Sequence, residues 1–206
     1  MATQDIYDAV IQYNLRGIAD LVQAELDSGT DIAVLLKQGL ISPMDKIGQL
    51  FSEGELFIPE MLMAAKAMKN GLEVLRPHLT QTDSKPKDAI IIGTVHGDLH
   101  DIGKNLVTMM LEGAGFQVTD LGVNVGTQKF IDAVNEHDAK IVGLSALLTT
   151  TMPAMKETVA ALKKEIPGIK IMVGGAPVTQ SSANKIGAEG YGEDAPSAVK
   201  LAREFI

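Results

Sequence analysis

A short polar segment, VHGDLHDIGKN at residues 95–105, carries residue types that suit metal or acid–base chemistry. His96 and His100 supply imidazoles, and Asp98 and Asp101 supply carboxylates. Imidazole and carboxylate groups are common metal ligands, and they are also frequent general acids and bases. Four interpretations of the segment follow: a metal site, an acid–base pair, a phosphate loop or a polar turn.

Some of these interpretations lack the residues that they need. A phosphate loop requires Walker spacing or GxGxxG, and the segment has neither. A hydrolytic zinc or iron site needs three or four convergent ligands, and beyond this loop the second half offers only His137 and scattered carboxylates. A flavin-binding module would use aromatic side chains, which are few here. A polar turn with a capping Asp remains open for so short a pattern.

A further hypothesis is that His100 coordinates a metal already held in a macrocycle. A histidine bound to a metal usually donates its other ring N–H to a carboxylate, which fixes the tautomer and raises the basicity of the ring. Asp98 is two residues away, so in an extended or turning loop both side chains can point the same way. Gly103 would then let a bulky ligand approach the backbone.

The composition is that of a globular protein. The chain has 206 residues, enough for one large domain or two small ones, and 46% of them are hydrophobic. Its net charge of −8 argues against binding to nucleic acid, and no window is long and apolar enough to cross a membrane. No signal peptide is evident, so a cytoplasmic location is expected. The absence of cysteine excludes thiolate metal sites and thiol catalysis.

The first 79 residues predict a small antiparallel bundle of amphipathic helices. Apolar residues recur at helical spacing throughout this region, and proline and glycine mark the ends of the segments. Thr30 or Asp31 is expected to cap the third helix, which ends near Gly39, and Ser42 with Pro43 is expected to open the fourth. The predicted helices span residues 5–13, 16–27, 31–39, 42–51 and 59–75.

Residues 80–87, TQTDSKPK, are polar and contain proline, and they are predicted to link two domains. From Asp88 onward, short β-branched runs alternate with segments long enough for crossover helices. This alternation predicts an α/β domain over residues 88–206, with a doubly wound, five-stranded parallel sheet of the flavodoxin/Rossmann-like class. The strands are expected at residues 88–95, 116–122, 140–148, 170–176 and 189–192.

Three of these strands end in distinctive residues. The first leads into the segment at 95–105, ahead of a helix expected to begin near Ile102, and the third ends in LSALLTT. The fourth ends in VGGAP, where Gly174 and Gly175 are expected to leave an unfilled slot between strands. Ligands of open parallel sheets bind outside the carboxyl ends of the strands, so these three ends are predicted to meet at one site.

The set Asp98-x-His100-x-x-Gly103, Ser145-x-Leu147 and Gly174-Gly175 resembles the signature of corrinoid (cobalamin) binding proteins. It is similar to the cobalamin module of methionine synthase. The layout is similar to that of the small corrinoid proteins in methanogen and acetogen methyltransferase systems. Residues 54–75, GELFIPEMLMAAKAMKNGLEVL, resemble the last helix of the family's cap domain. The resemblance covers essentially the whole chain.

The resemblance implies that a corrinoid loses its own lower base and that His100 replaces it as the lower axial ligand of cobalt. Asp98 would accept the hydrogen bond from the other ring nitrogen, and Ser145 would extend this relay. The displaced nucleotide tail would pass Gly174 and Gly175. Phe57 and Met61 of the helical cap are candidates for the upper face, although both also suit a bundle core. The implied cofactor-binding residues are Gly97, Asp98, Leu99, His100, Asp101, Ile102, Gly103, Ser145, Leu147, Thr149, Gly174, Gly175, Ala195, Phe57 and Met61.

The resemblance further implies a methyl carrier without a complete active site of its own. A donor-specific corrinoid methyltransferase would load the methyl group, and a second methyltransferase would pass it to a thiol coenzyme or a folate. A reductive activase is the other expected partner, and neither nucleic acid nor membrane is expected. The helical cap would act as a lid that moves on the linker. The alternatives are a cobalamin-dependent sensor or regulator, a mutase subunit that uses adenosylcobalamin, and a metal hydrolase based on His96, Asp98 and His100.

Overall fold

The computed structural model describes residues 2–78 and 87–206. The chain divides into two compact units, chiefly the residues before and after the boundary between Lys87 and Asp88. The segment predicted as a linker, residues 80–87, lies outside the described residues except for Lys87, which opens the first strand. None of the described helices is both long and apolar enough to cross a bilayer.

The first unit is a bundle of helices, as the spacing of its apolar residues predicted. Asp31 caps the third helix as expected, because its carboxylate accepts the Val34 N–H at 3.0 Å. Fully buried aliphatic and methionine side chains from every long helix form the core of the unit, among them Ile6, Val22, Ile47 and Met68. The helices are α1 (Ala2–Ile11), α2 (Ile18–Asp27), α3 (Ile32–Val34), the π-helix η1 (Leu35–Ile41), α4 (Ser42–Ser52), α5 (Ile58–Leu75) and the 3₁₀-helix η2 (Arg76–His78).

The predicted break between the third and fourth helices is wrong. The chain stays helical from α3 through η1 into α4, and the Ser42 N–H donates to the Lys37 carbonyl five residues earlier. Gly39 is buried inside this continuous helix, and a Cβ there would lie 3.1 Å from the Ile6 side chain. Gly39 therefore serves close helix packing, which a sequence pattern cannot distinguish from a helix stop.

The second unit contains a five-stranded parallel sheet in the order β2-β1-β3-β4-β5, which confirms the predicted flavodoxin-like topology. Thr94 at the end of β1 pairs with Ser145, Ser145 pairs with Gly174, and Gly174 pairs with Gly192. The carboxyl ends of these strands are thus level, so the loops that follow them start from one edge. The strands are β1 (Lys87–Thr94), β2 (Phe116–Asp120), β3 (Ile141–Ser145), β4 (Lys170–Gly174) and β5 (Gly190–Gly192).

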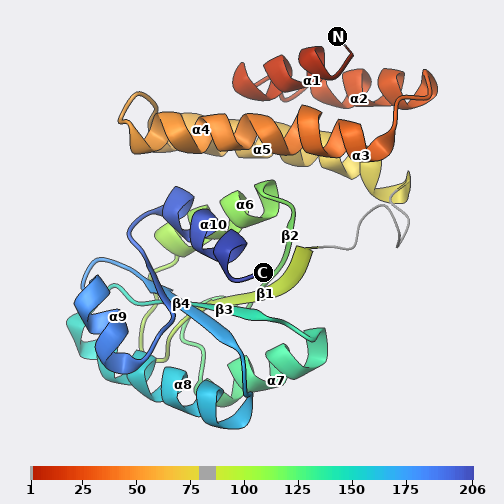
Figure 1. Ribbon diagram of the computed structural model, residues 1–206. Coiled ribbons are helices and arrows are strands. Elements are labelled where there is room, and N and C mark those ends of the chain that lie inside the picture. The colour runs from red at the N-terminus through yellow and green to blue at the C-terminus, as the bar shows by residue number, and fades with distance from the viewer. Residues whose placement is uncertain (1, 79–86) are drawn as a thin grey trace. The chain divides into compact units, whose positions relative to one another are not determined.

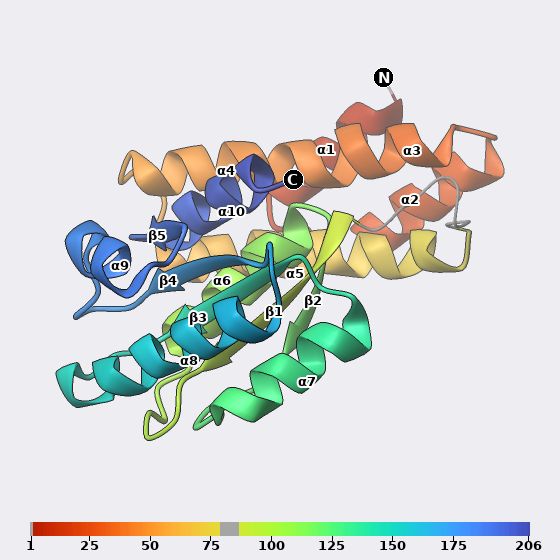
Figure 2. The ribbon, with the colours of Figure 1, turned by 60° about the horizontal axis from the view of Figure 1, so that its bottom comes forward.

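Helices cover both faces of the sheet, as a doubly wound domain requires (Figures 1 and 2). Helices α6 and α10 lie on one face, and α7, α8 and α9 lie on the other. Phe130 of α7 and Met155 of α8 pack with Val142 of β3 in a buried apolar core. The helices are α6 (Ile102–Gly113), α7 (Thr127–His137), α8 (Met152–Glu165), α9 (Gln180–Ile186) and α10 (Ala195–Glu204), and a short 3₁₀-helix, η3 (Thr149–Thr151), precedes α8.

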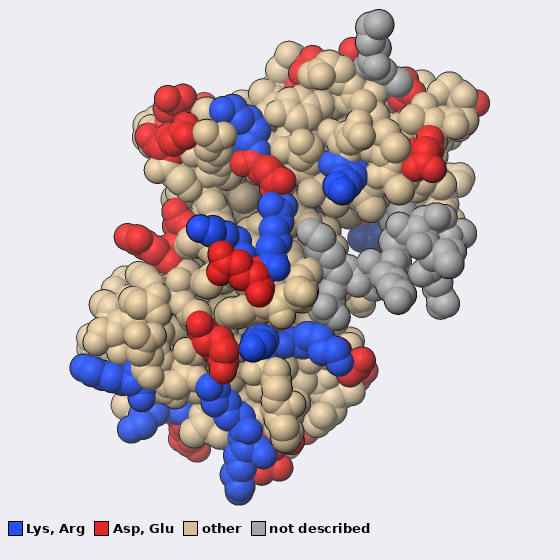
Figure 3. Space-filling model, in the orientation of Figure 1, with Lys and Arg blue, Asp and Glu red and all other residues tan. Residues whose placement is uncertain are grey.

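Charged side chains of both signs are interspersed on the face of the molecule drawn in Figure 3. Lysine and arginine side chains alternate there with aspartate and glutamate, in a protein whose net charge is −8. A surface that binds a phosphate backbone would instead gather basic residues into one field.

Gly174 and Gly175 let neighbouring backbone come close. A Cβ on Gly175 would lie 1.9 Å from the carbonyl oxygen of Ala146, and one on Gly174 would lie 2.9 Å from that of Gly192. The expected unfilled slot is therefore not present at these two Cβ positions, because main chain from β5 and from the end of β3 fills them. The glycine pair brings adjacent strand ends together at the edge that carries the functional loops.

We expect Gly175→Ala to lower the free energy of unfolding by about 3 kcal/mol or more, since the new Cβ clashes with main chain at a φ of +119°. Gly168→Ala is the matched control, because its φ is +89° and nothing lies within 4 Å of its Cβ position. Strain alone should cost the control about 1–2 kcal/mol. Urea unfolding measures the free energy of unfolding of both variants. Equal decreases in the two variants would show that the close approach of Gly175 to Ala146 does not contribute to the cost of the new Cβ.

Candidate functional site

The polar loop that follows β1 is fixed to the sheet at several points. Val95 forms a parallel bridge with Val125, and its N–H donates to the Ser145 carbonyl at 3.0 Å. The buried hydroxyl of Thr94 donates to the His100 carbonyl at 2.8 Å, at the far end of the loop. Helix α6 then begins at Ile102, where the sequence predicted it. The loop therefore has a defined conformation at the carboxyl edge, between the β2 and β3 sides.

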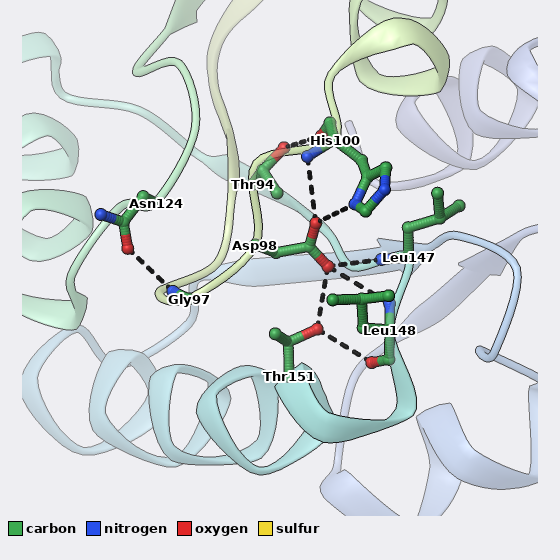
Figure 4. A network of polar contacts seen from close by, with 8 residues as sticks. All are labelled: Thr94, Gly97, Asp98, His100, Asn124, Leu147, Leu148 and Thr151. Carbon is green, nitrogen blue, oxygen red and sulfur yellow. Dashed lines mark hydrogen bonds and ion pairs between the residues drawn. The ribbon is translucent and has the colours of Figure 1, made fainter.

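The Asp98 carboxylate is buried and accepts five hydrogen bonds (Figure 4). Its Oδ1 accepts the His100 N–H at 3.1 Å and the His100 ring Nδ1–H at 2.7 Å. Its Oδ2 accepts the N–H groups of Leu147 at 2.7 Å and Leu148 at 3.3 Å, and the Thr151 hydroxyl at 2.9 Å. One carboxylate thus ties the loop after β1 to the segment after β3.

These contacts decide the ionisation of Asp98. Burial would raise the pKa of its carboxyl group, since it disfavours the charged form. The backbone N–H groups of Leu147 and His100, the His100 ring and the Thr151 hydroxyl outweigh burial, and together they hold the pKa well below its usual range. Asp98 is therefore an anion at neutral pH, able to accept hydrogen bonds but not to donate them.

His100 presents one ring nitrogen outward. Because ionised Asp98 can only accept, Nδ1 carries the proton of their shared hydrogen bond, and in the neutral ring the lone pair is on Nε2. The His100 side chain is 50% exposed, whereas the Asp98 side chain is fully buried. The arrangement is that of a metal-binding imidazole whose orientation and tautomer are set by a carboxylate behind it.

Large apolar side chains are exposed in the segments on either side of His100. Leu99 is 71% exposed and Ile102 is 81% exposed, and Leu147 and Leu148 from the segment after β3 are also exposed. A Cβ on Gly103 would meet nothing within 4 Å, so the packing of the protein itself does not require glycine there. Exposed apolar residues beside a free imidazole nitrogen suit a wide, largely apolar ligand that carries its own metal.

A hydrolytic metal site is not supported in the described part of the chain. Among residues 2–78 and 87–206, no three His, Asp or Glu side chains gather closely enough to hold a metal ion. His96 is exposed in the same loop, and Asp101 accepts a hydrogen bond from the Asn105 amide at 3.1 Å at the start of α6. The metal of a macrocycle brings its other ligands with it, so a single imidazole among the described residues suits such a metal better than a bare ion.

The hydroxyl that joins Asp98 comes from Thr151, which sequence reasoning missed. Ser145, the residue expected to extend the relay, is half-buried at the end of β3, where its carbonyl accepts the Val95 N–H. Thr151 is the last of three consecutive threonines, and their types alone do not show which of them turns inward. Thr149, expected at the nucleotide tail, is exposed at the start of η3, and Ala195 is buried in the first turn of α10.

Phe57 and Met61, the candidates for the upper face, belong to the helical unit. Phe57 directly precedes α5 and is 69% exposed, and its N–H donates to Glu60 at 2.9 Å. Met61, one turn into α5, is fully buried. Of the two, only Phe57 offers a side chain to a ligand in this structure.

Comparison with known proteins identifies the family. A B12 binding domain model matches residues 89–200, and a second B12 binding domain model matches residues 2–76. The chain is 42% identical to dimethylamine corrinoid protein 1 of Methanosarcina acetivorans over 179 residues, which are 85% of this chain and 84% of that one.

Two solved structures resemble the chain over nearly its whole length. One is a cobalamin-binding protein from Desulfitobacterium hafniense, with 32% identity, a TM-score of 0.81 and coverage of 99% of this chain and 98% of that one. The other belongs to the methanol:cobalamin methyltransferase complex of Methanosarcina barkeri, with 32% identity, a TM-score of 0.88 and coverage of 98% and 78%.

The chain therefore belongs to the B12-binding corrinoid proteins of methyltransferase systems, as the sequence predicted. Its cofactor is a corrinoid, a cobalt macrocycle. The residues at the carboxyl edge fit this group, because they offer one free imidazole nitrogen among exposed apolar side chains and an open position at Gly103.

We expect Asp98→Asn to lower the free energy of unfolding by about 2–4 kcal/mol at pH 7, because the amide forces an N–H group against buried donors. The folded-state pKa of Asp98 lies below its unfolded value of about 3.9, so the charge stabilises the fold above that pH. This stabilisation is lost as the pH falls toward the folded-state pKa. The difference in free energy of unfolding between Asp98→Asn and wild type should therefore become smaller below about pH 4.

Urea unfolding of the ligand-free protein between pH 7 and pH 3 measures this gap. Asp132→Asn is the control, since Asp132 is exposed on α7 and accepts a hydrogen bond from the Gln128 side chain four residues before it. It should remain near the wild type at every pH. A gap for Asp98→Asn that stays constant down to pH 3 would contradict the account of the buried anion.

Proposed function

We propose that this protein carries methyl groups on a corrinoid bound with His100 as the lower axial ligand. A donor-specific corrinoid methyltransferase would load the methyl group, and a second methyltransferase would transfer it to a thiol coenzyme or a folate. The observation that carries the proposal is the hydrogen bond from the His100 Nδ1 to the buried Asp98 carboxylate, which leaves Nε2 as the free nitrogen of a half-exposed side chain.

The part played by this chain is to hold and orient one imidazole. Asp98 is fixed by Leu147, Leu148 and Thr151, so the ring of His100 is directed before any ligand arrives. The carboxylate also raises the basicity of Nε2, which strengthens it as an electron-pair donor. The corrinoid, when bound, supplies the cobalt that bears the methyl group. Because Asp98 stays ionised, the strength of its hydrogen bond to Nδ1–H would tune how strongly Nε2 binds the metal.

The remaining predicted residues have roles in the same proposal. Ser145 ends β3 and Thr149 opens η3, and their hydroxyls would bind the displaced nucleotide tail, with Ala195 lining that path. The close approach of the main chain at Gly174 and Gly175 would give the tail a surface free of side chains.

The helical unit would cover the methyl-bearing face, with exposed Phe57 as its contact. Residues 1–79 would then act as a lid domain, joined through residues 80–87 to a corrinoid-binding domain at 88–206. Such a lid must open for a methyltransferase to reach the cofactor. This motion would control access to the cofactor and would not itself take part in the transfer of the methyl group.

The relatives favour a small methylated donor. One is a dimethylamine corrinoid protein, and another belongs to a methanol:cobalamin methyltransferase complex. We infer a methylamine or methanol methyltransferase as the loading partner, with a reductive activase that restores the cofactor after oxidation. The same relatives favour methyl transfer over the sensor and mutase alternatives.

The test compares His100→Ala with His96→Ala, an exposed histidine four residues earlier in the same loop. Each protein is mixed with hydroxocobalamin under reducing conditions and desalted, and its visible absorption spectrum is recorded. Wild type and His96→Ala should retain about one corrinoid per chain with the spectrum of an imidazole-ligated form, because neither changes the axial nitrogen. His100→Ala should lose that spectrum.

Two results would contradict the proposal. If His100→Ala keeps the wild-type spectrum, a group other than His100 is the axial ligand. If the His96→Ala spectrum changes as much as that of His100→Ala, the effect belongs to the loop as a whole and not to one nitrogen.

A further inference from the structure

Asn124 lies in the loop between β2 and α7 and holds the histidine loop from the β2 side (Figure 4). The side-chain oxygen of Asn124 accepts the Gly97 N–H at 2.8 Å. The backbone N–H of Asn124 donates to the Asp98 carbonyl at 2.9 Å. These two hydrogen bonds enclose the Gly97–Asp98 peptide, one just before it and one just after it. Together with the hydrogen bond from the Asp98 N–H to the Val95 carbonyl at 3.2 Å, they hold the main chain from which the Asp98 side chain projects.

The backbone at this point needs such a restraint. Gly97 has a φ of +83°, and glycine moves between conformations more easily than any other residue. Asn124 itself has a φ of +53°, in the left-handed region, which asparagine tolerates better than most residues because its short side chain can hydrogen-bond locally. Asn124 and Gly97 are thus both in the left-handed region, and Asn124 makes two hydrogen bonds to the loop that carries His100.

The two sides of the loop are held in different ways. From the β3 side, the N–H groups of Leu147 and Leu148 and the Thr151 hydroxyl bind the Asp98 carboxylate. From the β2 side, Asn124 binds only main chain of the loop. The Asp98 N–H donates to the Val95 carbonyl at 3.2 Å, but none of the contacts to the Asp98 carboxylate reaches the Gly97 N–H, whose acceptor is Asn124. Losing the Asn124 oxygen would leave that N–H without its acceptor and would loosen the main chain that places Asp98 and His100.

We propose that Asn124 is a positioning residue for His100, which keeps the imidazole hydrogen-bonded to Asp98 and its Nε2 directed outward before the corrinoid binds. This inference rests on the proposed function, because it assumes that Nε2 of His100 is the axial ligand. Asn124 is exposed, so replacing it opens no cavity, and its effect passes through the loop.

Three variants distinguish the effect of the Asn124 side chain from the effect of its left-handed backbone conformation. Asn124→Gly keeps the left-handed conformation and the N–H bond to Asp98, but it removes the acceptor for Gly97. Asn124→Asp keeps an oxygen in the acceptor position. Asp138→Gly is the control, because Asp138 has a φ of +47° at the C-terminal end of α7 and its carboxylate pairs with Lys140.

The first measurement needs no corrinoid. The ¹⁵N NMR signals of the imidazole in the ligand-free protein report which ring nitrogen carries the proton. Wild type, Asn124→Asp and Asp138→Gly should show a single tautomer at His100, with the proton on Nδ1. Asn124→Gly should show signals averaged between the two tautomers, because the loop no longer holds the ring against Asp98.

The second measurement is corrinoid affinity, followed by visible absorption. Losing one hydrogen bond that orients the ligand should weaken binding of hydroxocobalamin to Asn124→Gly by about 3- to 10-fold. The histidine-ligated fraction should fall with it, and Asn124→Asp should stay within about twofold of wild type.

The outcomes separate this inference from the proposed function. Imidazole signals in Asn124→Gly that match the wild type overturn the positioning role, as does an affinity loss that Asp138→Gly reproduces. A wild-type protein that binds corrinoid with no dependence on His100 overturns the axial ligand itself, whatever the signals of the Asn124 variants show.

Discussion

The buried carboxylate of Asp98 is the group on which the arrangement of the site depends. Burial alone would favour its neutral form, yet N–H and hydroxyl donors from two loops keep it ionised. Its two oxygens have different partners: Oδ1 faces the His100 backbone and ring, and Oδ2 faces Leu147, Leu148 and Thr151. The segment after β3 therefore sets the position of the anion, and the anion sets the position of the imidazole. The charge is stabilised by the same contacts that give the site its shape.

The topology of the sheet makes these contacts possible. β1 and β3 are neighbours in the order β2-β1-β3-β4-β5, and the chain leaves β1 toward β2 on one side and later returns to β3 on the other. Their end residues Thr94 and Ser145 are paired, so the loops that follow diverge from one level. Such a switch point is where open α/β sheets bind ligands, because diverging loops leave room between them. Here that place holds one directed imidazole with exposed leucine and isoleucine side chains in the same segments.

Much of the fold and the centre of the site could be predicted from the sequence. β-Branched runs marked the strands, and the spacing of Asp98 and His100 allowed their hydrogen bond to be anticipated. Four features could not be found in this way. Ser145 at the end of β3 and Thr151 at the end of η3 both carry hydroxyls, and the turn at η3 brings Thr151 to Asp98. Gly39 looks like a helix stop but serves packing, and Gly174 and Gly175 admit main chain where an empty slot was expected. Asn124 lies in a segment with no chemical signature, and its contacts depend on a bridge between Val95 and Val125. Each of these depends on long-range geometry, which residue types do not encode.

The measurement that tests the central claim most directly is electron paramagnetic resonance of the protein loaded with cob(II)alamin, prepared with and without ¹⁵N-labelled histidine. The unpaired electron on cobalt couples to the nucleus of the lower axial nitrogen, so each line is split into a triplet by ¹⁴N and a doublet by ¹⁵N. If the exposed nitrogen of His100 is the ligand, labelling should convert triplets into doublets, and the His100→Ala protein should not show this change. Triplets that persist in the labelled wild-type protein would show that the corrinoid keeps its own base, and they would contradict the role assigned here to the Asp98–His100 pair.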